Sequence, residues 1–572
     1  MDIIKDFRQQ IIAACQQEIA NLPDKLSAKI TLEAPKDSQH GDLSTNAALL
    51  LSGISKQAPI NLAENLSKLF KEKFSFCSEI SIAKPGFINF KMQPAFWQNS
   101  VKEIYLNPDF AKNNLGNNEK INIEFGSPNP TGPLHVGHTR GAIFGDVLAN
   151  ILNYTGYLVT KENYVNDAGK QIDVLAKSLY LRYQEIANNE TLEIPEGLYP
   201  GEYLIPVAAD IHAKFGNEFL QQDEQQYLDK FKSLAVTAML ELIKQGFSKL
   251  GIKHDVHFSE KTLHDNQAIK TLIEKLSSEG KTYQGCLPKP KGTSSEDWEE
   301  REQLLFRTTD FGDDIDRALQ KSDGNWTYFA ADAAYHQNKL ERGFKKMILI
   351  LGADHTGYQK RMQAMVSALS DGEAEIQIKL CQIVKFLNNG EAVKMSKRAG
   401  TFLTAEDVVN EVGMEALRFT MLTRKNDAPL DFDYAKVVEQ SKDNPIFYVQ
   451  YAHARICSVL RQENYASTAQ DLEQVKLLTL PQELELLKQL NLLPNLLENI
   501  SQNYEAHRLS FYLYDLAAKF HSYWSLGNTN NAMRIISSDK NITEARLILL
   551  KAVRNTLSTG LKLFNVAPLE RM

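Results

Sequence analysis

The sequence predicts an α/β fold organised around a parallel β-sheet, and two apolar strands indicate it. The first carries Ile121, Ile123 and Phe125 and leads through a stiff, proline-containing turn into a helix. The second is the apolar run 347–351, which is typical of a strand buried on both faces. Segments rich in glycine and polar residues follow both strands, at the positions where open parallel sheets bind ligands. The sequence therefore predicts a phosphate or nucleotide site at the carboxyl edge of this sheet.

Length and pattern predict three main parts in the 572-residue chain. Residues 1–110 are predicted to form an α+β domain, with helices and a small antiparallel sheet. Residues 111–410 are predicted to form the catalytic α/β domain, in which the stretch 170–324 is largely a helical insertion between two halves of one sheet. Residues 411–572 are predicted to be all-α, because their apolar residues recur at helical spacing.

The elements of the N-terminal part follow from periodicity and turn residues. Helical spacing of Phe7, Ile11 and Cys15 predicts a first helix. The polar turn 40–46 is expected to cap a helix that begins near Ala47. Two short alternating segments on either side of a Lys-Pro-Gly turn predict a pair of strands. This combination suits an appended binding domain, and a domain that only adds stability is the alternative.

The elements of the α/β and C-terminal parts are read in the same way. Residues 158–164 predict a second strand, and the turn 166–169 predicts the start of a long helix. A further strand is expected at 382–387. Apolar residues with helical spacing over 550–561 predict a helix near the end of the chain.

Composition narrows the class of protein. The formal charge of −7 offers no bulk electrostatic case for nucleic-acid binding, although a basic patch can lie on an acidic protein. The five cysteines are scattered and none forms a CxxC pair, so no bound zinc and no disulfide framework are expected. We expect a cytoplasmic protein, since the sequence shows neither a signal peptide nor a membrane span.

A histidine pair lies in the turn after the first strand. His135 and His138 are three residues apart at the predicted start of a helix, so both rings can point the same way. Imidazoles at a helix N-terminus can donate hydrogen bonds to phosphate oxygens, and Gly137 lets a planar ligand approach the backbone. A metal pair is the alternative, but metalloprotease histidines are four apart with a glutamate between them. Two ordinary surface histidines are the simplest alternative, which the preceding Ser-Pro-Asn-Pro-Thr-Gly-Pro string disfavours.

A basic segment, 394–398, reads Lys-Met-Ser-Lys-Arg. Its Lys394, Ser396 and Lys397 suit a movable clamp on a triphosphate, because lysine is a point charge on a flexible stem. A short basic run alone is usually a solvated loop. Together with the histidine pair, however, it makes a specific signal for ATP chemistry.

These residues resemble a known family. The strings HVGH at 135–138 and KMSKR at 394–398 resemble the two signatures of class I aminoacyl-tRNA synthetases. Five further segments are similar to arginyl-tRNA synthetases and extend the resemblance over nearly the whole chain: 84–89, 124–133, 352–355, 447–455 and 570–572. Val136 replaces the usual isoleucine, and Glu415 stands where the family often has the aspartate of a DALR string. Neither departure removes a catalytic side chain.

The resemblance implies a Rossmann-type catalytic domain that joins arginine to ATP as arginyl-adenylate, releases pyrophosphate, and transfers the arginyl group to the terminal ribose of its tRNA. It also implies an N-terminal domain that contacts the tRNA, a C-terminal helical domain that binds the anticodon, and Mg²⁺ on the ATP oxygens. In this family the first step generally requires bound tRNA. The partners are then arginine-specific tRNA, arginine and ATP, with no membrane partner, and we expect a monomer.

The resemblance also assigns site residues. The catalytic residues are His135, His138, Lys394 and Lys397, and Gly137, Gly352 and Ser396 complete the ATP site. Arginine binding calls for carboxylates that face a planar guanidinium. The residues expected there are Glu124, Asn129, Tyr328, Asp332 and His355, with no metal ligand.

Two other hypotheses remain open. One is a class I ligase for another amino acid, or a nucleotidyltransferase that does not use tRNA. The other is a non-catalytic RNA-binding paralogue, which would be expected to have damaged signatures. Both histidines and both lysines of the signatures are present. Since a guanidinium pocket rejects wrong ligands by leaving buried polar groups unpaired, the 170–324 insertion is not expected to be a hydrolytic editing domain.

Overall fold

The computed structural model describes residues 2–19, 22–27, 29–35, 37–288, 301–321, 323–393, 403–462 and 469–572. The chain divides into two compact units. One unit contains residues 1–113 and 440–572, so it joins the two ends of the chain, and the other contains 114–439. Lys394, Ser396 and Lys397 lie outside the described residues.

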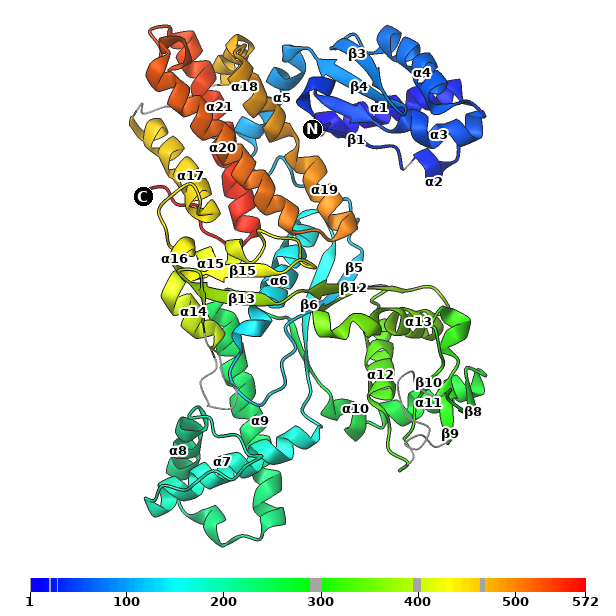
Figure 1. Cartoon of the computed structure of the whole chain (residues 1–572), viewed down its shortest axis with the longest axis vertical. Helices are drawn as coiled ribbons and strands as arrows, with labels where there is room; N and C mark the ends of the chain where they lie inside the picture. The colour runs from blue at the N-terminus through cyan, green and yellow to red at the C-terminus, as the bar shows by residue number, and fades with distance from the viewer. Residues whose placement is uncertain are drawn as a thin grey trace. The chain divides into compact units, whose positions relative to one another are not determined.

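A parallel sheet of five described strands lies at the centre of the unit 114–439 (Figure 1). The order across the sheet is β12-β11-β5-β6-β7, and all neighbouring pairs are parallel. The strands are β5 (Lys120–Glu124), β6 (Leu158–Val165), β7 (Val256–Ser259), β11 (Lys346–Gly352) and β12 (Glu375–Cys381). The first strand in the sequence, β5, is central. Strands β6 and β7 lie on one side of it, and β11 and β12 lie on the other, so the strand order reverses between β5 and β11. This is the Rossmann-type topology, and the predicted fold class is confirmed.

The central strands β5 and β11 are buried, as their apolar residues predict. Ile121 and Ile123 of β5 are fully buried, and so are Met347, Ile348 and Leu349 of β11. A strand covered on both faces reads as a continuous apolar run, as β11 does. The stretch 170–324, which is predicted to be largely an insertion, also supplies one strand of the central sheet, the edge strand β7.

Helices and two smaller sheets surround the central sheet. The helices of this unit are α6 (Thr139–Tyr154), α7 (Lys170–Asn188), α8 (Leu204–Phe215), α9 (Glu224–Lys249), α10 (Lys261–Asp265), α11 (Ala268–Ser278), α12 (Tyr328–Glu341), α13 (Gln359–Leu369), α14 (Ala405–Val412), α15 (Met414–Thr420) and α16 (Tyr434–Val437). The smaller sheets contain β8 (Thr282–Cys286), β9 (Glu302–Phe306) and β10 (Arg317–Ala318), and β13 (Val384–Asn388), β14 (Glu391–Ala392) and β15 (Leu430–Asp433).

Helices α7, α8 and α9 form a cluster with a hydrophobic core of its own (Figure 1). This core is rich in aromatic rings. Tyr180 stacks on Tyr227 with ring centroids 3.6 Å apart, and Phe231 packs edge-on against Tyr180. A separate core is expected for an insertion that must bury apolar surface without the sheet.

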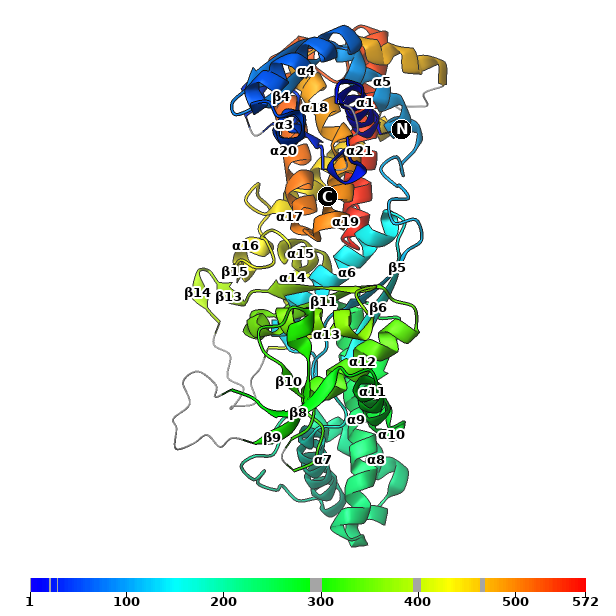
Figure 2. The same ribbon diagram turned by 90° about the vertical axis from the view of Figure 1, so that its right-hand side faces the viewer.

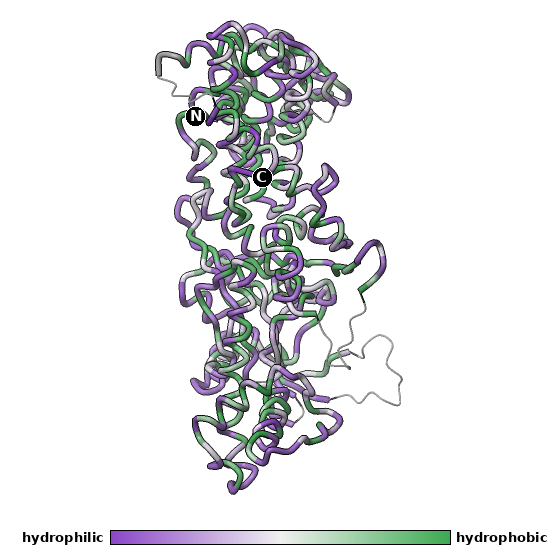
Figure 3. Tube along the Cα trace, turned by 90° about the vertical axis from the view of Figure 1, so that its left-hand side faces the viewer, coloured by the Kyte–Doolittle hydropathy of each residue, from purple (hydrophilic) through white to green (hydrophobic). Residues whose placement is uncertain are grey.

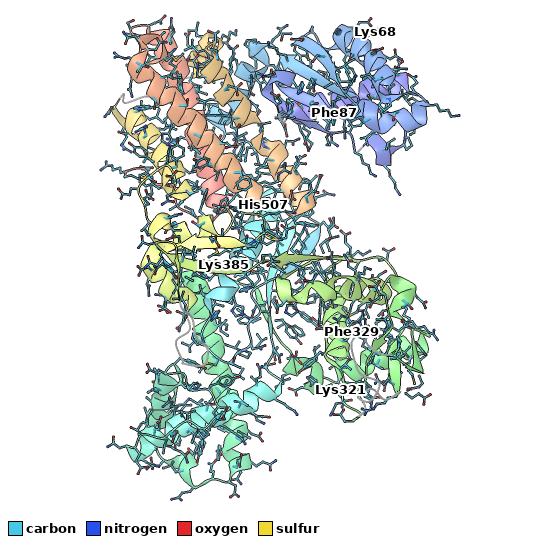
Figure 4. The ribbon with its side chains drawn as sticks, in the orientation of Figure 1. Lys68, Phe87, Lys321, Phe329, Lys385 and His507 are labelled. Atoms are coloured by element: carbon cyan, nitrogen blue, oxygen red, sulfur yellow. The ribbon has the colours of Figure 1, made fainter. Side chains whose placement is uncertain are left out.

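The N-terminal part of the other unit is the predicted α+β domain. Its antiparallel sheet has the order β1-β2-β4-β3, and α1, α3 and α4 pack against it (Figures 1 and 2). The elements are α1 (Ile3–Glu18), α2 (Asp24–Ser27), β1 (Leu32–Glu33), β2 (Leu43–Thr45), α3 (Ala47–Ser55), α4 (Pro59–Lys73), β3 (Cys77–Ala83), β4 (Phe87–Met92) and α5 (Pro94–Leu106). Phe7 lies at the centre of the core, edge-on to Phe74 and Phe90. Phe87 at the start of β4 is exposed (Figure 4).

The C-terminal part of the same unit is helical. It contains α17 (Pro445–Gln462), α18 (Pro481–Asn491), α19 (Leu493–Asn503), α20 (His507–Thr529) and α21 (Lys540–Leu563). Hydrophobic and hydrophilic residues alternate along the trace of the chain (Figure 3), as expected for helices with one buried face. The two parts share hydrogen bonds, such as the one from Asn555 Nδ2 to the Ile104 carbonyl, and an ion pair between Lys5 and Glu498. None of the described helices is long and apolar enough to cross a membrane.

Candidate active site

The turn after β5 is rigid and is fastened to the neighbouring strand. Gly126 has a φ of +62°, a conformation that glycine adopts without strain, and an added Cβ would lie 2.9 Å from the Phe247 ring. The Gly126 carbonyl accepts a hydrogen bond from Asn163 Nδ2, and the Tyr164 amide donates to Ser127 Oγ. The proline-rich continuation of the turn is therefore held to β6 as well as to β5.

The histidine pair begins the following helix as predicted. His135 caps the 3₁₀ helix η2 (Val136–His138), and its Nδ1 accepts the Gly137 N–H at 2.9 Å. A nitrogen that accepts carries no proton, so the neutral His135 ring holds its proton on Nε2. His138 Nδ1 lies 3.2 Å from the His135 carbonyl, and the two ring centroids are 6.2 Å apart. Both Gly137 and His138 are exposed.

The turn is also paired with residues 403–405, which follow the basic segment in the sequence. His135 and Thr404 form an antiparallel β-bridge. The Val136 amide donates to the Leu403 carbonyl at 3.0 Å, and the Ala405 amide donates to the Leu134 carbonyl at 2.9 Å. The first described residues after the basic signature are therefore attached, by their backbone, to the histidine signature.

Two buried arginines hold helix α6 in place behind the turn. Arg140 donates to the carbonyl of Ala428 at 2.6 Å and to that of Lys425 at 2.9 Å. Arg418, in the string that stands for DALR, makes a 2.5 Å ion pair with Asp146 of α6. Arg418, and not residue 415, forms this ion pair. Glu415, which replaces the aspartate common in the family, therefore does not affect the ion pair.

Carboxylates gather at the carboxyl edge of the sheet. Asp332, on the second turn of α12, is partly buried and accepts a 2.5 Å hydrogen bond from the Tyr358 hydroxyl. The pKa of Asp332 is raised to about 6, mainly by burial and also by the charges of Glu124 and Glu260, while the Tyr358 hydrogen bond and the charge of Arg361 act to lower it. The predicted arginine-site residues Asp332 and Glu124 are thus brought close enough to interact.

Glu260 is a residue of this pocket that the sequence analysis missed. It follows β7 directly, is only 6% exposed, and accepts a hydrogen bond from Tyr164 at the end of β6. Burial and the charges of Glu260 and Asp332 raise the pKa of Tyr164 far above its usual value. The signal was the position of Glu260 after a short apolar strand, but this stretch was assigned to the insertion. Tyr358 was missed too, because nothing local distinguishes it from other tyrosines.

Glu124 faces a cation of the protein. Its Oε2 lies 2.6 Å from Nζ of Lys339, and both side chains are almost fully buried. Lys339 also lies over the ring of Tyr335, at 4.3 Å from the centroid. Glu260 lies 3.7 Å from Nε2 of His264, and the charge of Arg361 acts on Asp332. Asp332, which is partly buried, and Glu260, which is buried, nevertheless form no ion pair with a lysine or arginine among the described residues.

The remaining predicted residues are more exposed. Asn129 Nδ2 donates to Gln171 Oε1 at 3.0 Å. Tyr328, at the first position of α12, is 71% exposed, and Lys321 lies 5.4 Å from its ring centroid (Figure 4 shows Lys321 and the adjacent Phe329). His355 is exposed and lies 3.5 Å from Asp354.

Gly352 ends β11 beside β5, at the point where the strand order reverses. Its backbone is exposed, so a ligand can approach it. In the described part of the chain, no group of three His, Cys, Asp or Glu side chains is arranged to hold a metal ion.

A parallel sheet whose order reverses beside a histidine-bearing turn at a helix start defines a nucleotide-binding enzyme of the class I synthetase type. Family models agree. Residues 100–456 match the catalytic domain of class I tRNA synthetases (R), residues 5–92 match the arginyl tRNA synthetase N-terminal domain, and residues 449–572 match the DALR anticodon binding domain.

Full-length relatives extend this result. The arginine–tRNA ligase of Wolbachia pipientis wMel is 49% identical over 96% of this chain and 95% of its own length, and that of Bartonella quintana is 48% identical over 99% of each. The chain therefore belongs to the arginyl-tRNA synthetase family. The Thermus thermophilus arginyl-tRNA synthetase structure, at 20% identity, shares the fold over 100% of both chains with a TM-score of 0.76.

Proposed function

We propose that Asp332 and Glu260 bind the guanidinium group of arginine in the enzyme's first step. The observation that carries this proposal is the pair of carboxylates, one buried and one partly buried, that form no ion pair with a lysine or arginine among the described residues, although Arg361 and His264 lie near them. A planar guanidinium supplies five N–H donors and a permanent positive charge, so it suits two carboxylates that approach from different elements. Tyr358 and Tyr164 hold these carboxylates in orientation through hydrogen bonds.

As a member of its family, the chain is an arginine–tRNA ligase that uses ATP. In the proposed first step the arginine carboxylate attacks the α-phosphorus of ATP, the bond to the β-phosphate bridging oxygen breaks, and pyrophosphate leaves. The terminal ribose hydroxyl of the tRNA then attacks the arginyl carbonyl and releases AMP. The first step needs positioning and positive charge more than a protein base.

The histidine turn is positioned to supply donors for the phosphates. We expect His135 to donate from Nε2, since its Nδ1 accepts from the Gly137 amide. His138 stands at the start of α6, where the helix dipole favours an anion. Lys394, Ser396 and Lys397 are proposed to contact the leaving pyrophosphate. ATP enters as its Mg²⁺ complex, so the metal arrives with the substrate.

The other proposed ligands divide between the two substrates. Asn129 and His355 are expected to hold the amino and carboxylate ends of arginine, and Tyr328 to pack beside its side chain. Gly137 and Gly352 leave backbone open for ATP. We propose that Glu124 acts mainly through its ion pair with Lys339, which neutralises one carboxylate of the pocket. That leaves the charge of Asp332 and Glu260 for arginine.

A second pocket, in the C-terminal helical part, suits a nucleobase of the tRNA. This cavity of about 510 Å³ is lined by Tyr451, Arg455 and Trp524 together with the last residues of the chain. Arg455 lies 4.2 Å from the Tyr451 ring centroid and 5.1 Å from that of Trp524. Aromatic faces and guanidinium groups are the surfaces on which unpaired RNA bases stack. We propose that an anticodon base of arginine-specific tRNA binds here.

Aminoacylation kinetics test the arginine pocket. Glu260→Gln and Asp332→Asn are each expected to raise the KM for arginine, with a loss of about 10- to 100-fold in kcat/KM, because each removes one charged hydrogen-bond acceptor. Glu341→Gln is the matched control, since Glu341 is exposed on the same helix as Asp332. Equal values of kcat/KM for arginine in all three variants would contradict the proposal. A cytoplasmic location and a monomeric state remain predictions from the sequence.

A further inference from the structure

The helical cluster α7–α9 contacts the signature turn at residues that flank the proposed arginine site. Tyr203, the residue before α8, donates from its hydroxyl to the Thr131 carbonyl at 2.7 Å. A Cβ added to Gly132 would lie 3.3 Å from Cζ of Tyr203, so the ring packs directly on this glycine. Tyr199 also hydrogen-bonds to Thr131. Two tyrosines that pack on the cluster's core therefore fix the middle of the turn.

A second contact fixes the start of the same turn. Gln171, on the first turn of α7, accepts the Asn129 Nδ2 hydrogen bond at 3.0 Å, and the Thr131 amide donates to the Asn129 carbonyl at 2.8 Å. An amide side chain that donates to one side presents its oxygen to the other. Gln171 thus holds Asn129 in an orientation in which Oδ1 can accept a hydrogen bond from an ammonium group.

The third helix of the cluster meets the end of the turn. A Cβ added to Gly246 of α9 would lie 2.9 Å from Cβ of Leu134, so α9 and the turn are in close backbone approach. Residues of α7 and α9, and Tyr203 directly before α8, therefore contact residues 129–134. A change in the packing of the cluster would move the turn that carries Asn129 and leads into His135.

We propose that Tyr203 and Gln171 are positioning residues for arginine activation, through which the α7–α9 cluster sets the geometry of the arginine and ATP sites. Neither residue touches the reacting atoms. Tyr203 holds the Thr131 carbonyl, and Gln171 holds the Asn129 amide in its ligand-accepting orientation. This inference rests on the proposed function of the turn.

Arginine-dependent ATP–pyrophosphate exchange in the presence of tRNA tests the role of Tyr203. Tyr203→Phe removes the hydroxyl but keeps the ring, and we expect kcat/KM for arginine to fall about 3- to 10-fold, as for the loss of one hydrogen bond. Tyr180→Phe is the matched control. It also removes a phenol that donates to a backbone carbonyl, that of Phe219, but this carbonyl lies inside the cluster. The control should lower the melting temperature and leave the KM for arginine unchanged.

Gln171 allows a rescue test. Gln171→Glu keeps an oxygen that accepts from Asn129 and should retain the wild-type KM for arginine, whereas Gln171→Met should raise this KM about 2- to 5-fold. Gln171 is exposed, so neither change should affect folding. If Tyr203→Phe matches Tyr180→Phe and Gln171→Met matches Gln171→Glu, the positioning role is wrong. Absence of arginine-dependent exchange in the wild-type chain would instead contradict the proposed function itself.

Discussion

The hydroxyl of Tyr358 donates a 2.5 Å hydrogen bond to Oδ2 of Asp332, and this contact joins the end of the 3₁₀ helix after β11 (η5, Ala353–Tyr358) to helix α12. Burial and the like charges of Glu124 and Glu260 disfavour the ionised form of Asp332, and the positive charge of Arg361 offsets them only in part, so the net effect raises its pKa. An ionised Asp332 is therefore costly in the free enzyme. Binding of a guanidinium would remove that cost, which makes the pocket selective for a permanent cation.

Asp332→Asn should stabilise the free protein while it weakens arginine binding. The pKa of Asp332 is raised from 3.8 to about 6, so the folded state binds its proton more tightly than the unfolded state. The cost of ionisation is absent below about pH 4 and fully present above about pH 6. At pH 7.5 the variant should gain up to about 3 kcal/mol in the free energy of unfolding. Urea unfolding measures this gain, and a loss of stability would contradict the burial argument.

Asp371→Asn is the matched control for this measurement. Asp371 is exposed, and its ion pair with Lys281 lowers its pKa instead of raising it. The control should not be stabilised at pH 7.5. A gain of equal size in both variants would show that the effect is not specific to the pocket.

Arginine affinity should fall as the pH drops through about 6. Protonation of Asp332 removes the charge that faces the guanidinium, whereas arginine itself stays charged. Binding should therefore be full above about pH 7 and weaken about tenfold for each unit below the pKa of Asp332. Calorimetric titration of arginine across this range measures the profile. The profile of Asp332→Asn should be flat, and a pH dependence that persists in this variant would assign the titration to another group.

Tyr358→Phe should move that profile to higher pH. The Tyr358 hydroxyl stabilises the ionised form and lowers the pKa of Asp332, so its removal favours the protonated form. The KM for arginine at pH 7.5 should rise about 3- to 10-fold, because a larger fraction of Asp332 is then protonated at that pH. Arg361, which lies over the Tyr358 ring at 4.3 Å, should keep the phenylalanine ring in place. An unchanged inflection point would mean that Tyr358 does not control the ionisation of Asp332.

Removing one partner of the buried ion pair between Lys339 and Glu124 should destabilise the protein more than removing both partners. Lys339→Met leaves Glu124 buried and unpaired, and should cost about 3–5 kcal/mol in the free energy of unfolding. The double variant Lys339→Met/Glu124→Gln should lose much less, because no buried charge is left without a partner. Denaturant unfolding of the two single variants and the double variant gives the coupling energy. Additive losses would contradict direct pairing.

Much of the fold followed from the sequence because the strands and turns carry local signals. The apolar run 347–351 is typical of a strand buried on both faces, which β11 is, and the proline-rich turn with His135 and His138 indicated a helix start. Glu260 and Tyr358 could not be predicted in this way. Each reaches the pocket through the crossover order of the sheet, which a local pattern does not reveal. The buried Lys339 was missed for the same reason, since its partner lies on a strand 215 positions away.

The N-terminal part shows a related limit. Periodicity predicted the helices and strands of this part. It did not predict that this part packs with the C-terminal helices in one compact unit. The hydrogen bond from Asn555 to the Ile104 carbonyl joins residues 451 positions apart. Such contacts depend on tertiary packing, and neither segment signals them by itself.

ATP–pyrophosphate exchange with arginine and with citrulline, each with and without arginine-specific tRNA, tests the central claim most directly. Citrulline has nearly the shape of arginine but lacks the positive charge that Asp332 and Glu260 require. Exchange should occur with arginine plus tRNA, and citrulline should support at least about 10²-fold less, because it leaves the carboxylates unpaired. Exchange at comparable rates with citrulline, or none with arginine plus tRNA, would contradict the account.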